Sequence, residues 1–141
     1  MPEPVPNTQT MTVAIALIER DGRYLITKRL PDDSFGGFWE FPGGKLDPGE
    51  DLESCLAREI LEELGIEVKV GPVIQIVEHR YPSRLLKFHC FACSIERGEP
   101  RPIECSELRW VTPAELADFE FPPASGPIIE GLQKNQVDRS A

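Results

Sequence analysis

Three glutamates near the middle of the chain, Glu59, Glu62 and Glu63, have a spacing that suits chemistry. At about 100° per residue, positions i, i+3 and i+4 fall on one side of a helix, so the three carboxylates would lie close together. Like charges at this spacing repel one another. A divalent cation would offset the repulsion, because carboxylate oxygens are suitable ligands for magnesium or manganese. The alternative is a solvated acidic face, which is what most runs of charge are.

The surrounding residues predict a helix from about Asp51 to Leu64. Asp51 is a suitable N-cap, and Gly65 supplies the left-handed residue that commonly ends a helix. Glu63 falls at the edge of the apolar side of this helix, where an unpaired buried charge is strongly unfavourable. The helix is therefore expected to do more than support the fold. Its apolar side is formed by Leu52, Leu56, Ile60 and Leu64.

A glycine-rich turn leads directly into the predicted helix, and the two together form one pattern of fixed positions. This pattern resembles the Nudix box, the signature of the Nudix hydrolases, without a departure. So many fixed positions in one loop-helix unit make the acidic-face alternative weak. The matching residues are Gly44, Glu50, Arg58, Glu59, Ile60, Glu62, Glu63, Gly65 and Ile66.

The resemblance implies a single-domain α/β (α+β) fold, the Nudix α/β/α sandwich, with a mixed β-sheet between helices. It also implies an enzyme that hydrolyses a nucleoside diphosphate linked to another group, with Mg²⁺ as cofactor and Mn²⁺ as a substitute. By the same resemblance, the metal ligands are Glu59, Glu62 and Glu63, together with the backbone carbonyl of Gly43.

Two further catalytic assignments follow from the resemblance. Arg58 and Glu50 are expected to pair and hold the loop against the helix, a role that is compatible with an ordinary ion pair. The general base is either a glutamate of the box or an acid from a distant loop, because Nudix members use both. Glu104 is the distant candidate, as base and as a further metal ligand, and the alternative for it is a plain surface acid.

Outside the box the chain is similar to MutT-like Nudix enzymes from about Thr12 to Leu132. These enzymes cleave nucleoside triphosphates to monophosphate and pyrophosphate, and the best-known members remove 8-oxo-dGTP from the nucleotide pool, a DNA-repair role. The likeness depends on four stretches: Ile26-Thr27-Lys28-Arg29, Trp39-Glu40-Phe41-Pro42-Gly43-Gly44-Lys45, Phe121-Pro122-Pro123-Ala124 and Pro127-Ile128-Ile129.

This similarity implies a set of substrate-binding residues. Two of them have simpler alternatives: Arg29 as a solubilising residue on an edge strand, and Phe41 as a core residue. The full set is Arg29, Glu40, Phe41, Pro42, Gly43, Gly44, Lys45 and Ser125.

Ser125 is a departure from the MutT-like pattern. After Phe-Pro-Pro-Ala the 8-oxo-dGTP enzymes typically place an asparagine, whose amide reads the oxidised guanine, and here a serine follows. A hydroxyl cannot make the paired donor and acceptor contacts of an amide. Related enzymes with another residue at this position prefer pyrimidine triphosphates such as CTP or methylated dCTP. The resemblance therefore implies the reaction and leaves the base open.

Two other functions stay open. One is hydrolysis of another diphosphate, such as a dinucleotide or a nucleotide sugar, within the same fold. The other belongs to a different class, a non-catalytic Nudix-like module that senses nucleotides or reads DNA lesions. Such modules usually lose glutamates of the box, and in this chain all are present.

Composition limits the class of partner. The formal net charge of −9 argues against a long nucleic acid, whose phosphates would be repelled, although a small nucleotide can arrive with metal. No apolar run approaches the roughly 18 residues of a membrane span, so no membrane contact is expected. The N-terminal Met-Pro-Glu-Pro-Val-Pro lacks the features of a signal peptide, which favours a cytoplasmic location. A monomer or a homodimer is expected.

The chain order predicts a domain at 10–134, between a disordered tail at 1–9 and a frayed end at 135–141. Cys90 and Cys93 have zinc-like spacing but fall in a predicted strand, where residues i and i+3 face opposite sides, so reduced core thiols are expected. Strands are expected at about 12–18, 24–29, 39–44, 66–78 (broken at Gly71-Pro72), 85–95 and 107–111, and short helices after Thr112 and at 125–133.

Overall fold

The computed structural model of the protein describes the backbone of residues 9–140 and the side chains of residues 9–134. Within these residues, seven strands form one mixed sheet in the order β3-β2-β1-β6-β5, with β4 beside β1 and β7 beside β2. The strands are β1 (Gln9–Arg20), β2 (Arg23–Lys28), β3 (Trp39–Glu40), β4 (Gly43–Lys45), β5 (Glu67–Tyr81), β6 (Arg84–Arg97) and β7 (Glu107–Val111). The helices are α1 (Leu52–Leu64) and α2 (Gly126–Ser140), with 3₁₀ turns η1 (Ala114–Asp118) and η2 (Pro123–Ser125).

β1 is the central strand, and its residues from Val13 to Ile18 are all buried. It pairs in parallel with β6 and antiparallel with β4 and with the start of β2. Val13, Ile15 and Leu17 join one core and the intervening residues join the other, because neighbouring side chains on a strand point to opposite faces. This confirms the strand covered on both faces that the continuous apolar run predicts.

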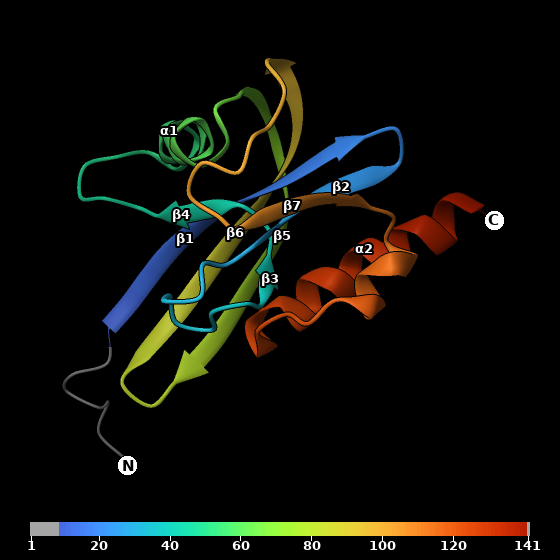
Figure 1. The fold of residues 1–141 in the computed structure, drawn as a ribbon. Coiled ribbons are helices and arrows are strands. Elements are labelled where there is room, and N and C mark those ends of the chain that lie inside the picture. Colours follow the sequence, from blue (N-terminus) through green and yellow to red (C-terminus); the bar gives the residue numbers. More distant parts are fainter. Residues whose placement is uncertain (1–8, 141) are drawn as a thin grey trace.

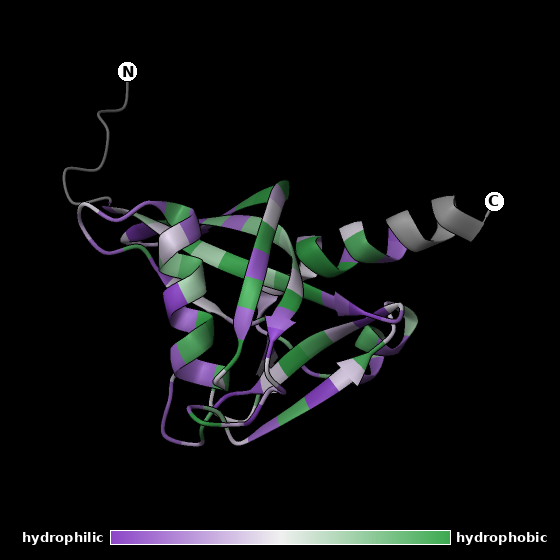
Figure 2. Ribbon diagram, turned by 90° about the horizontal axis from the view of Figure 1, so that it is seen from above, coloured by the Kyte–Doolittle hydropathy of each residue, from purple (hydrophilic) through white to green (hydrophobic). Residues whose placement is uncertain are grey.

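The two cores lie on opposite faces of the sheet, and one helix covers each (Figure 1). The apolar side of α1 packs on one face with Cys55, Leu56, Ile60 and Leu64. On the other face, Ile128 and Leu132 of α2 pack beside Trp39 and Phe41. In Figure 2, α1 at the left carries both green apolar and purple polar stretches, as expected for a helix with one face against a sheet. The predicted mixed sheet between helices is confirmed.

The ends of α1 are those expected from the sequence. The Asp51 carboxylate accepts a hydrogen bond of 2.8 Å from the backbone N–H of Ser54, as an N-cap should. Gly65 is left-handed at φ 70°, and its N–H donates to the Leu61 carbonyl at 2.9 Å. The predicted Asp21-Gly22 hairpin also forms, with φ of 53° and 78° at the two residues.

Several predicted boundaries are wrong. β1 begins at Gln9, three residues before the expected Thr12, because it continues to pair with β6. β5 runs through Gly71-Pro72 as one strand with register shifts, because a β-bulge absorbs the expected break. The helix after Thr112 is a 3₁₀ turn, and α2 continues beyond 133 to Ser140. Residues 1–8 of the predicted N-terminal tail and residue 141 lie outside the described residues.

The cysteines confirm the prediction of core thiols. Cys90 packs in the core under α2 and Cys93 in the core under α1, so the two side chains lie on opposite faces of the sheet. Burial raises the pKa of Cys90 to about 12 and that of Cys93 to about 11, which keeps both as neutral thiols. Among the described residues, no helix is long and apolar enough to cross a membrane.

Candidate active site

The face of the sheet that α1 covers is called the α1 face. Glu63 is its most unusual side chain. Its Oε2 atom is buried and has no hydrogen-bond partner among the described residues. Burial raises the pKa of Glu63 to about 9, and the nearby carboxylates of Glu40, Glu59 and Glu104 add to the rise. A buried group surrounded by like charges is stable only if it holds a proton or gains a positive partner.

Arg58 organises the other acids of this face. Its guanidinium binds Glu50 through two hydrogen bonds, Nε to Oε2 at 2.9 Å and Nη2 to Oε1 at 3.0 Å. The Nη1 atom reaches Glu59 at 3.1 Å and Glu62 at 3.4 Å, and Nη2 reaches Asp47 at 3.3 Å. Hydrogen bonds from Arg58 lower the pKa of Glu50 to about 2. The expected Arg58–Glu50 pair is present, and it also orients two glutamates of the box.

Two glycines of β4 allow close approaches that a side chain would block. A Cβ added at Gly44 would lie 2.3 Å from the Glu59 carboxyl carbon, and one added at Gly43 would lie 2.0 Å from the Ala14 carbonyl oxygen. Both are far below real contact distances, so these positions require glycine. Gly44 thereby lets β4 lie directly against Glu59.

Glu104 reaches the same region from a distant part of the chain. The loop after β6 binds the carboxyl end of α1: the Glu63 carbonyl accepts from the N–H of Ile103 at 3.1 Å and from that of Glu104 at 3.3 Å, and the Leu64 carbonyl accepts from the Arg101 N–H at 2.9 Å. These bonds satisfy carbonyls that a helix end leaves free. The structure therefore brings the exposed Glu104 close to Glu63, although the two are far apart in sequence.

The α1 face fits a divalent cation, although its acids do not form a closed cage. Within the side chains that the structure describes, no group of three or more His, Cys, Asp or Glu residues is gathered as a metal site. Mg²⁺ usually takes one or two carboxylates and completes its shell with water and substrate phosphates, so a cage is not required. The buried, unpartnered oxygen of Glu63 and the repulsion around it are what a cation would offset.

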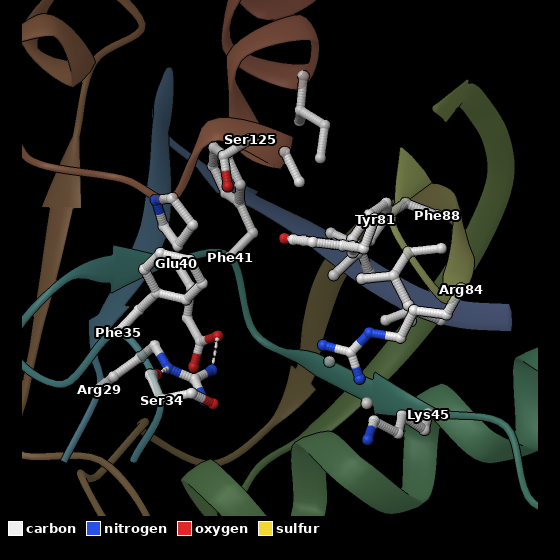
Figure 3. Close-up of a pocket in the computed structure, with 18 residues that line it drawn as sticks. Arg29, Ser34, Phe35, Glu40, Phe41, Lys45, Tyr81, Arg84, Phe88 and Ser125 are labelled. Carbon is white, nitrogen blue, oxygen red and sulfur yellow. Dashed lines mark hydrogen bonds and ion pairs between the residues drawn. The ribbon is translucent and has the colours of Figure 1, made fainter. Parts of the chain in front are cut away.

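A cavity of about 340 Å³ lies on the other face of the sheet, between the β2–β3 loop, the β5–β6 turn and η2 (Figure 3). Its walls come from elements that are far apart in sequence. All but one of the predicted substrate residues line it, namely Arg29, Glu40, Phe41, Gly43, Gly44, Lys45 and Ser125. The exception is Pro42, whose side chain is buried and whose carbonyl accepts the Ala16 N–H at 2.8 Å.

Arg29 and Glu40 form an ion pair in this cavity. Nη1 of Arg29 donates to Oε1 of Glu40 at 2.6 Å, and Nε donates to the Ser34 carbonyl at 2.7 Å. Burial raises the pKa of Glu40 despite the opposing effect of Arg29. Arg29 is therefore more than a solubilising edge residue, because both of its bonds fix the cavity wall.

Phe41 and Ser125 contribute to the upper wall in Figure 3. The Phe41 ring stacks on Phe121 with 5.4 Å between centroids and is buried, so it belongs to the core and also lines the cavity. Ser125 ends η2, where its N–H donates to the Pro122 carbonyl at 3.0 Å. The structure places this short hydroxyl in the wall where the resemblance expects an amide.

Sequence reasoning missed several cavity residues. Phe35 falls between the strands predicted at 24–29 and 39–44, and Tyr81 and Arg84 fall between those predicted at 66–78 and 85–95. The Arg84 guanidinium lies over the Tyr81 ring, 5.2 Å from its centroid. An aromatic and an arginine flanking a Pro-Ser turn were the available signal, because such side chains are typical of binding surfaces. The remaining missed residues are Val13, Ile15, Ser34, Leu86, Phe88, Pro122, Ala124 and Ile128.

Comparison with known proteins settles the family. Residues 13–131 match the NUDIX domain family, which is most of the chain. The protein is a Nudix hydrolase. It is 33% identical to a CTP pyrophosphohydrolase of Escherichia coli (strain K12), over 92% of this chain and 96% of that protein. It is 35% identical to an 8-oxo-dGTP diphosphatase of Haemophilus influenzae, over 85% of this chain and 89% of that one.

A solved structure extends the comparison. The solution structure of the E. coli ORF135 protein matches with a TM-score of 0.83 and 31% identity, covering 99% of both chains. These relatives support the Nudix fold, the MutT-like resemblance and a pyrophosphohydrolase activity for this chain. The activities named for the two enzymes differ in the nucleobase, and nucleobase recognition is also where Ser125 departs from the MutT-like pattern.

Proposed function

We propose that this Nudix hydrolase cleaves a nucleoside triphosphate to nucleoside monophosphate and pyrophosphate, and that the reaction depends on Mg²⁺, with Mn²⁺ as a substitute. The observation that carries the proposal is the position of β4. Gly43, Gly44 and Lys45 line the cavity, and Gly44 also lies against Glu59 of the box. A nucleotide whose base enters the cavity would therefore bring its phosphates over β4 toward the carboxylates.

In this proposal Glu59, Glu62, Glu63 and the Gly43 carbonyl hold the metal, and Glu104 adds a ligand from the loop after β6. When bound, the metal neutralises and polarises the phosphates. The protein supplies position: Arg58 orients Glu59 and Glu62 through its hydrogen bonds. Phosphoryl transfer depends mainly on such positioning and on electrostatic stabilisation.

Water attacks a phosphorus atom, the bridging P–O bond breaks, and a carboxylate accepts the proton of the water. Either a glutamate of the box or Glu104 is that base. Replacement of Glu104 by Gln separates the two, because it removes a proton acceptor and leaves every box residue in place. Because Glu104 is also a proposed metal ligand, the variant is assayed at saturating Mg²⁺ and across pH. A large loss of kcat with loss of the acidic limb of the pH–rate profile assigns the base to Glu104, and a small loss with an unchanged profile assigns it to the box.

Two nucleobases are candidates for the substrate. The MutT-like resemblance favours an oxidised purine such as 8-oxo-dGTP, in a role of nucleotide-pool sanitation in the cytoplasm. Ser125 favours a cytosine nucleotide instead, such as CTP or 5-methyl-dCTP, because a hydroxyl does not provide the paired contacts of an amide. Relatives of both named activities match at similar identity.

A substrate panel with Mg²⁺ tests the proposal. It compares dGTP, 8-oxo-dGTP, dCTP, 5-methyl-dCTP, CTP, ADP-ribose and a dinucleoside polyphosphate, with the Glu63→Gln variant as control. Pyrophosphate release from a triphosphate that the variant does not catalyse supports the proposed reaction. The triphosphate that the enzyme hydrolyses best then identifies the preferred nucleobase. Turnover of ADP-ribose or the dinucleotide alone would replace the proposal with hydrolysis of another diphosphate, and no turnover at all would favour a non-catalytic module.

A further inference from the structure

Phe35 stands out among the cavity residues because the fold does not need it. Its side chain is 44% exposed, and it belongs to neither buried core. The ring contact that the structure gives it is with Phe38, at 5.6 Å between centroids and an angle of 57°. An exposed aromatic ring at a cavity wall is typical of a ligand-binding position rather than of a folding core.

The backbone holds this ring in an unfavourable conformation. Phe35 has a φ of 55°, in the left-handed region that bulky residues seldom adopt. Gly37 follows in the same region at 83°, and a Cβ at Gly36 would lie 2.3 Å from the Pro31 carbonyl oxygen. The loop is therefore tightly folded around the ring. Strain of this kind persists where the surrounding structure enforces it, and it clusters at functional sites.

The cavity wall itself enforces the position of Phe35. Arg29 donates one hydrogen bond to the carbonyl of Ser34, the residue next to Phe35, and another to the Glu40 carboxylate. The Arg29 guanidinium thus connects the β2–β3 loop to Glu40 in the cavity wall. The Phe35 ring is held beside the ion pair and directed toward the cavity, as Figure 3 shows.

A second aromatic residue lies across the cavity. Tyr81 projects from the β5–β6 turn on the side opposite Phe35 (Figure 3). A flat aromatic ligand between the two walls would gain stacking on the Phe35 face, while Arg29 and Glu40 supply polar contacts at its edge. A nucleobase has this combination of a π-face and a polar edge.

We propose that Phe35 is a base-stacking residue that contributes to nucleotide affinity in this chain. The inference rests on the proposed function, because it takes the ligand to be a nucleotide. Stacking is available in both the bound substrate and the transition state. It therefore acts on KM and on product affinity and leaves kcat almost unchanged.

Four variants test the role of Phe35. Phe35→Gly removes the ring and relieves the left-handed conformation, Phe35→Leu keeps apolar volume without a π-face, and Phe35→Trp restores stacking. Leu30→Ala is the matched control, because Leu30 is an exposed apolar residue of the same loop that does not line the cavity. For the best triphosphate of the panel, KM should rise about tenfold in Phe35→Gly and Phe35→Leu, the size of one lost base–aromatic stack.

The other readouts separate stacking from a structural role. Phe35→Trp should recover the affinity, and Phe35→Gly should melt no lower than the wild type because glycine tolerates positive φ. Inhibition by the nucleoside monophosphate product should weaken about tenfold in Phe35→Gly, whereas inhibition by inorganic pyrophosphate, which has no base, should not change. Equal weakening for both inhibitors, or an unchanged KM, would overturn the inference.

Calorimetric titration of 8-oxo-dGMP and CMP, the monophosphates of the two candidate nucleobases, into the wild type and Phe35→Gly separates this inference from the proposed reaction. If the wild type binds a monophosphate more tightly than the variant but hydrolyses no triphosphate, the proposed reaction fails and the stacking role stands. If it hydrolyses triphosphates and both proteins bind monophosphates equally, the stacking role fails alone. If the wild type binds neither monophosphate, the stacking role is excluded.

Discussion

The α1 face and the α2 face of the sheet carry different parts of the candidate site, and they are built differently. On the α1 face, Glu59, Glu62, Glu63 and Arg58 come from one helix, and Glu50 precedes it by two residues. On the α2 face, the cavity takes its walls from five strands, three connecting segments, η2 and α2. The reactive groups are thus local in sequence, whereas the binding wall depends on the complete tertiary structure.

The two faces also differ in charge. The acids of the α1 face are concentrated around one arginine, and the pKa of Glu63 is raised first by burial and then by its negative neighbours. The cavity on the α2 face has Arg29, Lys45 and Arg84 in its walls, against the single carboxylate of Glu40. A negatively charged nucleotide is attracted to the second surface and repelled by the first unless a cation is bound there. In the proposed reaction, a bound cation would therefore bring the phosphates and the carboxylates together.

The largest expected effect is at Glu63. Glu63→Gln should reduce kcat by about 10²- to 10³-fold, because it removes a charged ligand from the candidate metal site. Glu53→Gln is the control, since Glu53 is an exposed acid in the first turn of the same helix. Wild-type turnover by Glu63→Gln would contradict the assignment of the α1 face to the chemistry.

Glu63→Gln should also change how stability depends on pH without metal. The folded protein holds the Glu63 proton more tightly than the unfolded chain does, with a pKa of about 9 against an ordinary 4.5. The wild type therefore loses stability as pH rises through this window, and the variant should not lose this contribution. Thermal melting in a chelator at several pH values measures the difference. Parallel pH profiles for the two proteins would contradict the buried position of this carboxylate.

Substitutions at the two glycines of β4 test whether this strand separates the catalytic role of one sheet face from the structural role of the other. Gly44→Ala should push Glu59 away and reduce kcat by about tenfold to a hundredfold, because the added Cβ would lie 2.3 Å from its carboxyl carbon. Gly43→Ala should instead destabilise the fold by about 1–3 kcal/mol, because its Cβ meets the backbone of Ala14 rather than a side chain. Activity assays and denaturant unfolding measure both. The same pattern in both variants would show that β4 does not divide the two roles.

The local part of this molecule could be predicted from sequence, and the reason is physical. The Asp51 cap, the Gly65 cap and the Arg58–Glu50 pair all depend on contacts within one loop-helix unit. The two caps follow from helix periodicity and cap chemistry, whereas the Arg58–Glu50 pair was expected from the Nudix resemblance. The predicted cavity residues were identified from the family resemblance, because no local sequence pattern connects Arg29 with Ser125.

The missed residues depend on how whole elements are placed in the folded chain. Tyr81 and Arg84 are paired across the β5–β6 turn, and the cavity forms only where this turn lies beside the β2–β3 loop and η2. Phe35 lies in the cavity because Arg29 binds the loop carbonyl at Ser34, a contact that no spacing rule predicts. Such placements follow from the folded chain as a whole.

A smaller effect is expected at Ser125, where a substitution tests whether the cavity selects the nucleobase. Ser125→Asn restores an amide with a paired donor and acceptor, so the ratio of kcat/KM for 8-oxo-dGTP over dGTP should rise by about tenfold. Turnover of CTP should fall or stay constant. Ser125→Ala is the control, because it removes the hydroxyl without adding an amide. No change in the ratio would assign base selection to another wall of the cavity.

The smallest expected effect concerns Glu50, which binds Arg58 and is not itself a proposed metal ligand. Hydrogen bonds from Arg58 lower the pKa of Glu50 from 4.5 to about 2, so the pair stabilises the folded state above the ordinary pKa. This contribution should disappear as pH falls from about 4.5 to about 2, and the effect should be modest because solvent screens the pair. Melting curves across this range should be flatter for Glu50→Gln than for the wild type, with Glu53→Gln as control. If the Glu50→Gln and wild-type profiles run parallel, the pair orients the glutamates of the box without stabilising the fold.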